Sequence, residues 1–188
     1  LPEVRPLPPS LPSKIVCVGR NYREHAKELG HEIPTEVGIF FKPPSALLGA
    51  GESIRRPAVC QRLDYEGELA IVIGKQIKNI KEKDAKAAIW GVTLFTDWSA
   101  RDFPPNKMNL NFARGKNFDN CYSLGPCIVV GEVDAYNAQI ETFVNGARRQ
   151  NFNTSEMAFS FGEFLEHLTF GLTMYPGDIL ASGTGPGT

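Results

Sequence analysis

The chain has 188 residues, and its 20 Lys and Arg nearly balance 21 Asp and Glu, which gives a formal net charge of −1. This balance argues against nucleic acid or an anionic membrane as the main partner. Hydrophobic residues make up 42% of the chain, and no apolar run approaches the roughly 20 residues of a transmembrane helix, so the composition favours a globular protein.

The first half of the chain predicts short strands with few helices. A Pro-rich extended arm is expected over residues 1–13, followed by a single domain over residues 14–188. Apolar runs and breaker residues then predict a strand over 14–19, a helix over 22–29, strands over 39–41 and 65–73, a helix over 81–88 and a strand over 90–96.

The second half begins with a long irregular loop over residues 102–115, and loops of that length are often functional. It continues with predicted strands over 127–130 and 139–144, a hairpin turn at Asn145-Gly146, a helix over 160–167 and a strand over 177–182. The fold class expected from these elements is α+β and rich in strands. Because the chain stops at Gly-Pro-Gly-Thr, we expect the domain to be truncated at its C-terminus.

Four cysteines are far apart in the sequence and lack the C-x-x-C spacing of a zinc ribbon; they are Cys17, Cys60, Cys121 and Cys127. Buried free thiols in a reducing compartment are the expectation. The chain opens without a signal peptide and without an initiator Met. We therefore expect a cytoplasmic protein, or a mitochondrial one if a presequence was removed.

A pair of glutamates on one predicted strand is the strongest local signal for chemistry. Glu66 and Glu68 are two residues apart, so their carboxylates project from the same face of the strand. Adjacent carboxylates repel unless a proton or cation lies between them, and Mg²⁺ or Mn²⁺ is the natural partner. Asp97 follows the next apolar strand and would complete a three-carboxylate site. The alternatives are a solvated edge strand for the glutamates and a turn or N-cap role for Asp97.

A histidine and a glutamate lie on one face of the predicted helix over 22–29. His25 and Glu28 are three residues apart, and a carboxylate beside an imidazole orients it as a general base. An exposed helical ion pair is the alternative. Arg101 and Lys116 are candidate anion-binding side chains, although a solvated surface position is the common fate of either residue.

A set of short motifs runs in order through nearly the whole chain from Lys14. The set is K-I-V-C-V-G-R-N-Y at 14–22, H-A-K-E-L-G at 25–30, F-K-P-P at 41–44, D-Y-E-G-E-L-A at 64–70, Asp97 with S-A-R-D at 99–102, G-K-N-F-D at 115–119, L-G-P at 124–126, V-N-G at 144–146 with Gln150, P-G-D at 176–178 and G-T at 183–184. In this ordered set the chain resembles the fumarylacetoacetate hydrolase family. The resemblance is closest to its branch of acylpyruvate hydrolases, oxaloacetate decarboxylases and hydroxyhepta-diene-dioate isomerases.

The resemblance implies a mixed β-roll with short peripheral helices, a homodimer and a Mg²⁺ or Mn²⁺ cofactor. It implies metal ligands at Glu66, Glu68 and Asp97, catalytic residues at His25, Glu28 and Lys116, and substrate-binding residues at Arg101, Thr184 and Arg20. Two departures stand out. Pro104 replaces a Gln that many members carry, and members continue beyond the Gly-Thr motif.

The resemblance also implies a reaction. We expect a hydrolase that cleaves a carbon–carbon bond in small 2-oxo acids of the acylpyruvate or fumarylpyruvate type, through a metal-stabilised enolate and with His25 activating water. Isomerisation or decarboxylation of related diacids at the same site is the alternative. A β-rich metal-binding module without catalysis is the non-enzymatic alternative.

Overall fold

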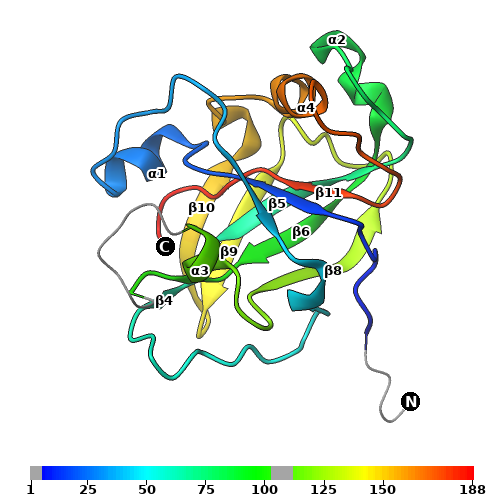
Figure 1. The fold of residues 1–188 in the computed structure, drawn as a ribbon. Helices are drawn as coiled ribbons and strands as arrows, with labels where there is room; N and C mark the ends of the chain where they lie inside the picture. The colour runs from blue at the N-terminus through cyan, green and yellow to red at the C-terminus, as the bar shows by residue number, and fades with distance from the viewer. Residues whose placement is uncertain (1–5, 103–111) are drawn as a thin grey trace.

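A mixed sheet of seven strands forms the centre of the protein. The computed structural model describes residues 6–102 and 112–188, and within them the strand order is β2-β1-β11-β5-β6-β8-β3 (Figure 1). The sheet strands are β1 (Ile15–Val18), β2 (Ile39–Lys42), β3 (Leu47–Leu48), β5 (Gly67–Ile73), β6 (Ile89–Asp97), β8 (Tyr122–Val129) and β11 (Ile179–Ala181). The pairs β1–β11 and β3–β8 are parallel, and the other neighbours are antiparallel.

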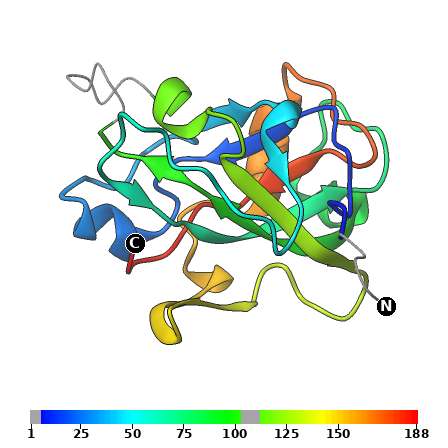
Figure 2. The ribbon, with the colours of Figure 1, turned by 90° about the horizontal axis from the view of Figure 1, so that it is seen from below.

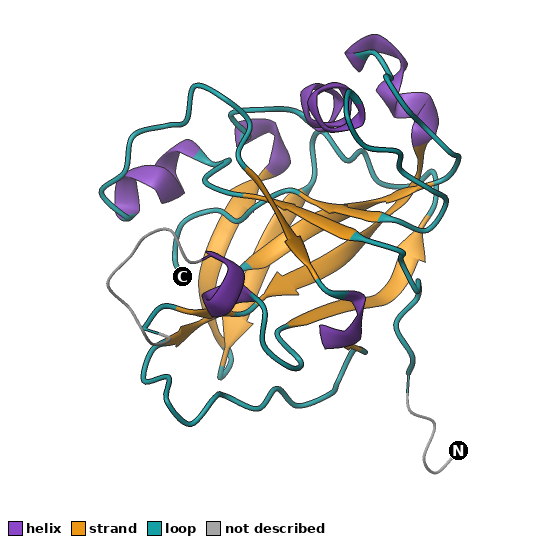
Figure 3. Cartoon of the chain, in the orientation of Figure 1, coloured by secondary structure: helices purple, strands orange, loops and turns teal. Residues whose placement is uncertain are grey.

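Two short strand pairs and several short helices surround this sheet (Figure 3). The strand pairs are β9 (Gln139–Val144) with β10 (Ala147–Asn153), and β4 (Leu63–Asp64) with β7 (Ser99–Ala100). The α-helices are α1 (Arg23–Glu28), α2 (Glu82–Ala85), α3 (Phe112–Lys116) and α4 (Phe161–Thr169), with 3-10 turns at Pro44–Ala46, Lys86–Ala88 and Thr154–Glu156. Among the residues described, no helix is long and apolar enough to cross a membrane.

Strand β5 is buried along its whole length because both faces of the sheet are covered. Its residues Leu69, Ile71 and Ile73 face a core that includes α4 and the β9–β10 hairpin, which lies below the sheet in Figure 2. Its residues Ala70 and Val72 face a second core with β1 and β8. The continuous apolar run in the sequence therefore reflects two-sided burial.

Most predicted elements are confirmed, including the α+β, strand-rich class, and β9 has the predicted bounds. The prediction of an irregular loop over 102–115 is wrong at its C-terminal end, because residues 112–116 form α3. Residues 103–111, which include Pro104, lie outside the described residues. Strand β10 was not predicted, and β8 begins five residues earlier than expected, at Tyr122. The burial expected of the cysteines holds for three of them, but Cys127 is exposed.

Gly67 lies between the two glutamates, at a point where the β9–β10 hairpin approaches β5 closely. A Cβ atom there would lie 2.2 Å from Oγ1 of Thr142 and 3.1 Å from Oε1 of Gln150. We expect Gly67→Ala to lower the free energy of unfolding by about 1–3 kcal/mol through overpacking, as measured by urea denaturation. Gly171→Ala is the matched control, since nothing lies within 4 Å of the position that a Cβ atom would take there. Equal stability of the two variants would contradict this packing argument.

Candidate active site

Strand pairing brings three carboxylates together at one end of the central sheet. Glu66 precedes β5 and Asp97 ends β6, and the Asp97 amide donates to the Glu66 carbonyl at 2.9 Å. Since Gly67 pairs with Thr96, Asp97 lies opposite Glu66, and Glu68 projects from the same face. One oxygen of each carboxylate lies within 4.8 Å of the others, and all three residues are buried. These positions exclude a solvated edge strand for the glutamates.

Cationic side chains surround two of the three carboxylates. The Lys116 ammonium donates to Glu66 Oε2 at 2.6 Å, to Asp97 Oδ2 at 2.8 Å and to the Ser99 hydroxyl at 2.7 Å. The Arg101 guanidinium donates to Glu66 Oε1 at 2.6 Å and to Asp64 at 2.9 Å. Neither side chain is therefore a freely solvated surface cation.

The two glutamates have opposite shifts in pKa because their partners differ. Burial would raise the pKa of Glu66, but Lys116 and Arg101 lower it to about 2. Burial, followed by the charges of Asp97 and Glu66, raises the pKa of Glu68 well above its ordinary value. Glu68 accepts a hydrogen bond from the Gly183 amide at 2.8 Å, and no described Lys, Arg or His forms a salt bridge with it.

The donor set fits a divalent cation. Three carboxylates supply hard oxygen ligands, which Mg²⁺ and Mn²⁺ prefer, and a cation at the cluster would relieve the repulsion that Glu68 experiences. The acidic triad could therefore bind a metal, and its oxygen chemistry does not by itself choose between the two ions.

The predicted His–Glu pair forms on α1. His25 is buried, with 4% of its surface exposed, and its Nδ1 lies 3.3 Å from Glu28 Oε2. Burial lowers the pKa of His25, and this effect outweighs the opposite influence of Glu66 and Glu28. Burial therefore favours the neutral imidazole, and it excludes a fully exposed helical ion pair. The charges of Glu66 and Arg101 both influence the pKa of His25, so the pair lies within electrostatic range of the carboxylate cluster.

The C-terminal turn, residues 183–188, contacts both α1 and β5. The Gly187 amide donates to the Glu28 carboxylate at 3.1 Å, so the chain end lies beside α1 (Figure 1). Thr184 is buried, and its hydroxyl donates to the Gly67 carbonyl at 2.9 Å. Its contacts hold the turn against β5. Arg20 is exposed with a positive φ of 57°, and it forms no salt bridge with any described residue. The substrate-binding role of Arg20 stays a prediction.

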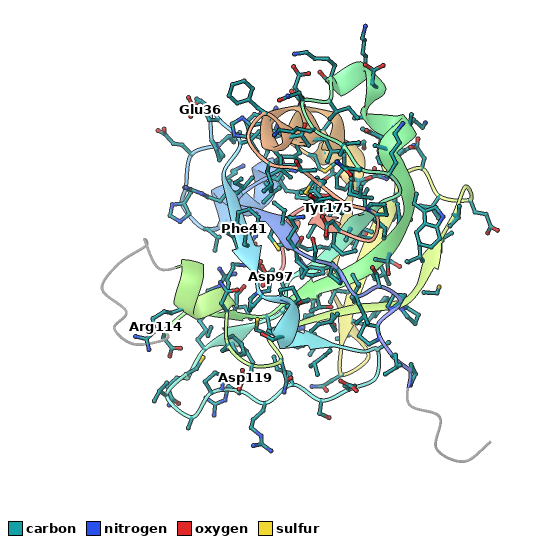
Figure 4. The ribbon with its side chains drawn as sticks, turned by 45° about the vertical axis from the view of Figure 1, so that its right-hand side comes forward. Glu36, Phe41, Asp97, Arg114, Asp119 and Tyr175 are labelled. Atoms are coloured by element: carbon teal, nitrogen blue, oxygen red, sulfur yellow. The ribbon has the colours of Figure 1, made fainter. Side chains whose placement is uncertain are left out.

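Two residues at the site were not predicted as functional, although both lie in the motifs. Lys42 donates to Asp97 Oδ1 at 2.5 Å from β2. Gln150 accepts from the Gly67 amide at 3.0 Å and donates to the Thr184 hydroxyl at 2.7 Å, which ties β10 to the C-terminal turn. Figure 4 shows Asp97 inside the fold, whereas Arg114 and Asp119 lie toward the outside.

Comparison with known proteins identifies the family. The family model described as fumarylacetoacetate (FAA) hydrolase C-terminal matches residues 14–188. The chain belongs to the fumarylacetoacetate hydrolase family. Membership agrees with the strand-rich fold and with the acidic cluster.

Relatives within the fumarylacetoacetate hydrolase family include enzymes. The chain is 46% identical over 176 residues to an uncharacterized protein of Methanocaldococcus jannaschii, covering 94% of this chain and 73% of the relative. It is 41% identical over 182 residues to a mitochondrial oxaloacetate tautomerase of Bos taurus, covering 96% of this chain and 58% of that protein.

Solved structures of the fumarylacetoacetate hydrolase family show the same fold. The 5-carboxymethyl-2-hydroxymuconate delta-isomerase of Mycobacterium smegmatis matches with a TM-score of 0.87 and 38% identity, covering 97% of this chain and 72% of that one. The 2-hydroxyhepta-2,4-diene-1,7-dioate isomerase of Mycobacterium marinum matches with a TM-score of 0.85 and 38% identity, covering 96% and 67% of the two chains. The chain is thus an enzyme of this family, and its named relatives are tautomerases and isomerases.

Proposed function

We propose that this protein is a divalent-metal-dependent enzyme that moves a proton between the keto and enol forms, or between double-bond isomers, of small 2-oxo acids. One observation carries the proposal: a buried His25–Glu28 pair is joined through the C-terminal turn to a cluster of three buried carboxylates, because the turn donates from Gly187 to Glu28 and from Gly183 to Glu68. A structural ion site does not require a general base next to it. The tautomerase and isomerase relatives support the same class of reaction.

Glu66, Glu68 and Asp97 would hold the metal, with Mg²⁺ or Mn²⁺ the expected ion. When bound, the ion supplies positive charge that polarises a substrate carbonyl and stabilises negative charge as it develops on that oxygen.

The side chains around the cluster would transfer the proton and bind the anionic substrate. With Nδ1 of His25 directed to Glu28, Nε2 is the nitrogen left to take a proton from the substrate and return it. The guanidinium of Arg101 keeps further N–H donors beyond those given to Asp64 and Glu66, and these suit a substrate carboxylate. Burial would lower the pKa of Lys116, but the Asp97 and Glu66 carboxylates raise it above its ordinary value, so the side chain stays a cation that favours anionic substrates.

Hydrolytic cleavage of a carbon–carbon bond is the second candidate, because the same pair can act on water. A neutral imidazole oriented by a carboxylate can remove a proton from a water molecule, which then attacks a carbonyl distal to the 2-oxo group. Acylpyruvates and fumarylpyruvate are the substrates suited to this reaction. Decarboxylation of oxaloacetate would develop the same negative charge without an attacking water.

A substrate panel tests the proposal. We would incubate the protein with oxaloacetate, a hydroxymuconate-type diacid, acylpyruvates and fumarylpyruvate, each with Mn²⁺ or Mg²⁺, and follow the enol absorbance and the products. We expect turnover that EDTA abolishes and that excess Mn²⁺ restores, since the cation neutralises the triad and the developing charge. Interconversion of the first two substrates supports proton transfer, whereas cleavage of the others supports the hydrolase. If the protein binds Mn²⁺ but turns over none of these substrates, the proposal of an enzyme of this type is contradicted.

A further inference from the structure

In the edge strand β2, a lysine is buried while apolar neighbours are exposed, which is the reverse of the usual distribution. In β2, the apolar side chains Ile39 and Phe41 are 37% and 46% exposed, whereas the Lys42 side chain is completely buried (Figure 4 labels Phe41). Burying an ammonium group is costly unless it is paired and hydrogen-bonded, and lysine is almost never fully buried otherwise. The buried Lys42 ammonium must therefore have partners inside the protein.

The Lys42 ammonium links three elements of the site. It donates to Asp97 Oδ1 at the end of β6 and to the carbonyl oxygen of Lys116 at the end of α3. Lys42 thus holds both a candidate metal ligand and the backbone of the lysine that faces that ligand.

These contacts leave Asp97 a single oxygen for the cluster. Lys42 donates to Oδ1, whereas Oδ2 accepts from Lys116, whose ammonium also donates to Glu66 Oε2. A carboxylate fixed in this way cannot easily rotate to offer both oxygens to one ion. Ca²⁺ accepts bidentate carboxylates and flexible coordination, whereas Mg²⁺ demands near-ideal octahedral geometry with small, single-oxygen ligands.

We propose that Lys42 is a positioning residue of the metal centre, which holds Asp97 to ligation through one oxygen and thereby favours Mg²⁺ and Mn²⁺ over Ca²⁺. The inference rests on the proposed function in one respect, that the cluster of Glu66, Glu68 and Asp97 binds a divalent ion. It goes further by assigning ion selectivity to a residue that would not touch the ion.

The chain offers a matched control for this role. Lys14 also donates to a buried aspartate, Asp178, at 2.6 Å, but this pair anchors the N-terminal arm, and neither residue contacts the carboxylate cluster. Lys14→Met and Lys42→Met therefore remove the same kind of ion pair. Both changes are expected to lower stability, and only Lys42→Met should alter metal binding.

The test measures dissociation constants for Mn²⁺ by electron paramagnetic resonance and for Ca²⁺ by competition, with the metals alone. We expect Lys42→Met to weaken Mn²⁺ binding by about 10- to 100-fold, as the loss of an outer partner of a metal ligand does, and to weaken Ca²⁺ binding less. The Mn²⁺/Ca²⁺ preference should fall in Lys42→Met and stay at the wild-type value in Lys14→Met. If Lys42→Met does not fold, Lys42→Leu, which also removes the donor to Asp97, is measured in its place.

The outcomes separate the two proposals. An unchanged Mn²⁺/Ca²⁺ preference in the Lys42 variant, with tight Mn²⁺ binding by the wild-type protein, overturns the role of Lys42 and leaves the proposed function standing. A wild-type protein that does not bind Mn²⁺ overturns the metal-dependent function, and the role of Lys42 falls with it. An equal change of preference in Lys14→Met would show a general effect of stability and overturn the positioning role.

Discussion

Replacing Glu68 with glutamine is expected to weaken metal binding strongly while leaving the fold intact. Glu68 carries no salt bridge to a described residue, and a glutamine oxygen can still accept the hydrogen bond from the Gly183 amide. The change removes one of three ligand charges and the repulsion from Asp97 and Glu66. We expect Mn²⁺ affinity to fall by at least about 100-fold and kcat/KM by about 1,000-fold, the loss of several kcal/mol of charge stabilisation.

The measurement compares Mn²⁺ titrations and urea denaturation of the variant and the wild-type protein. Glu66→Gln and Asp97→Asn should lose activity equally but should also lose stability, since each leaves Lys116 buried with one partner fewer. Removing one partner of a buried ion pair costs about 3–5 kcal/mol. Asp178→Asn is the control, because it breaks a partly buried lysine–aspartate pair away from the cluster. Wild-type Mn²⁺ affinity in Glu68→Gln would rule out the proposed ligand set.

The carboxylate cluster could be anticipated because its cues are local. The two-residue spacing of Glu66 and Glu68 places them on one face wherever a strand forms, and the apolar run after them predicts that strand. The position of Asp97 opposite Glu66 depends on the register between β5 and β6, which spacing along the chain does not determine. The assignment of Asp97 to the same site as Glu66 and Glu68 therefore depended on the ordered family motifs.

The unpredicted features depend on tertiary contacts. Strand β10 reads Ala-Arg-Arg-Gln-Asn-Phe-Asn and buries only Gln150 and Phe152, so its sequence lacks a strand pattern, and pairing with β9 determines its conformation. Helix α3 forms although it contains Gly115, a poor helix former, and Lys42 donates to the carbonyl at its end. A lysine in the run I-F-F-K reads as solvent-exposed, and its burial follows from Asp97, a residue far along the chain.

The pH dependence of catalysis should report on His25. The neutral imidazole is the base, and burial lowers its pKa below the ordinary 6.5, so kcat/KM is expected to decline only in acid, below pH 6.5. Glu28 raises the pKa through its hydrogen bond and charge. Glu28→Gln should therefore shift the acid limb to still lower pH and reduce kcat. Glu24→Gln, on the same helix but paired with Lys27 at the surface, should leave the profile unchanged. An acid limb of the kcat/KM profile with its midpoint above pH 6.5 would contradict the assignment of buried His25 as the base.

Replacing His25 with alanine should separate the reactions that need a base from the one that does not. Proton transfer by a positioned side chain contributes about 10²- to 10⁴-fold, so His25→Ala should reduce tautomerisation, isomerisation and carbon–carbon hydrolysis by that factor. Mn²⁺ affinity should stay at the wild-type value, because His25 lies outside the carboxylate cluster. Decarboxylation of oxaloacetate needs no attacking water and no proton removed from carbon, so we expect it to be largely retained. His31→Ala, a change at an exposed histidine, is the control for all assays. An equal loss of every activity would contradict a role for His25 in proton transfer alone, because decarboxylation requires no proton to be removed.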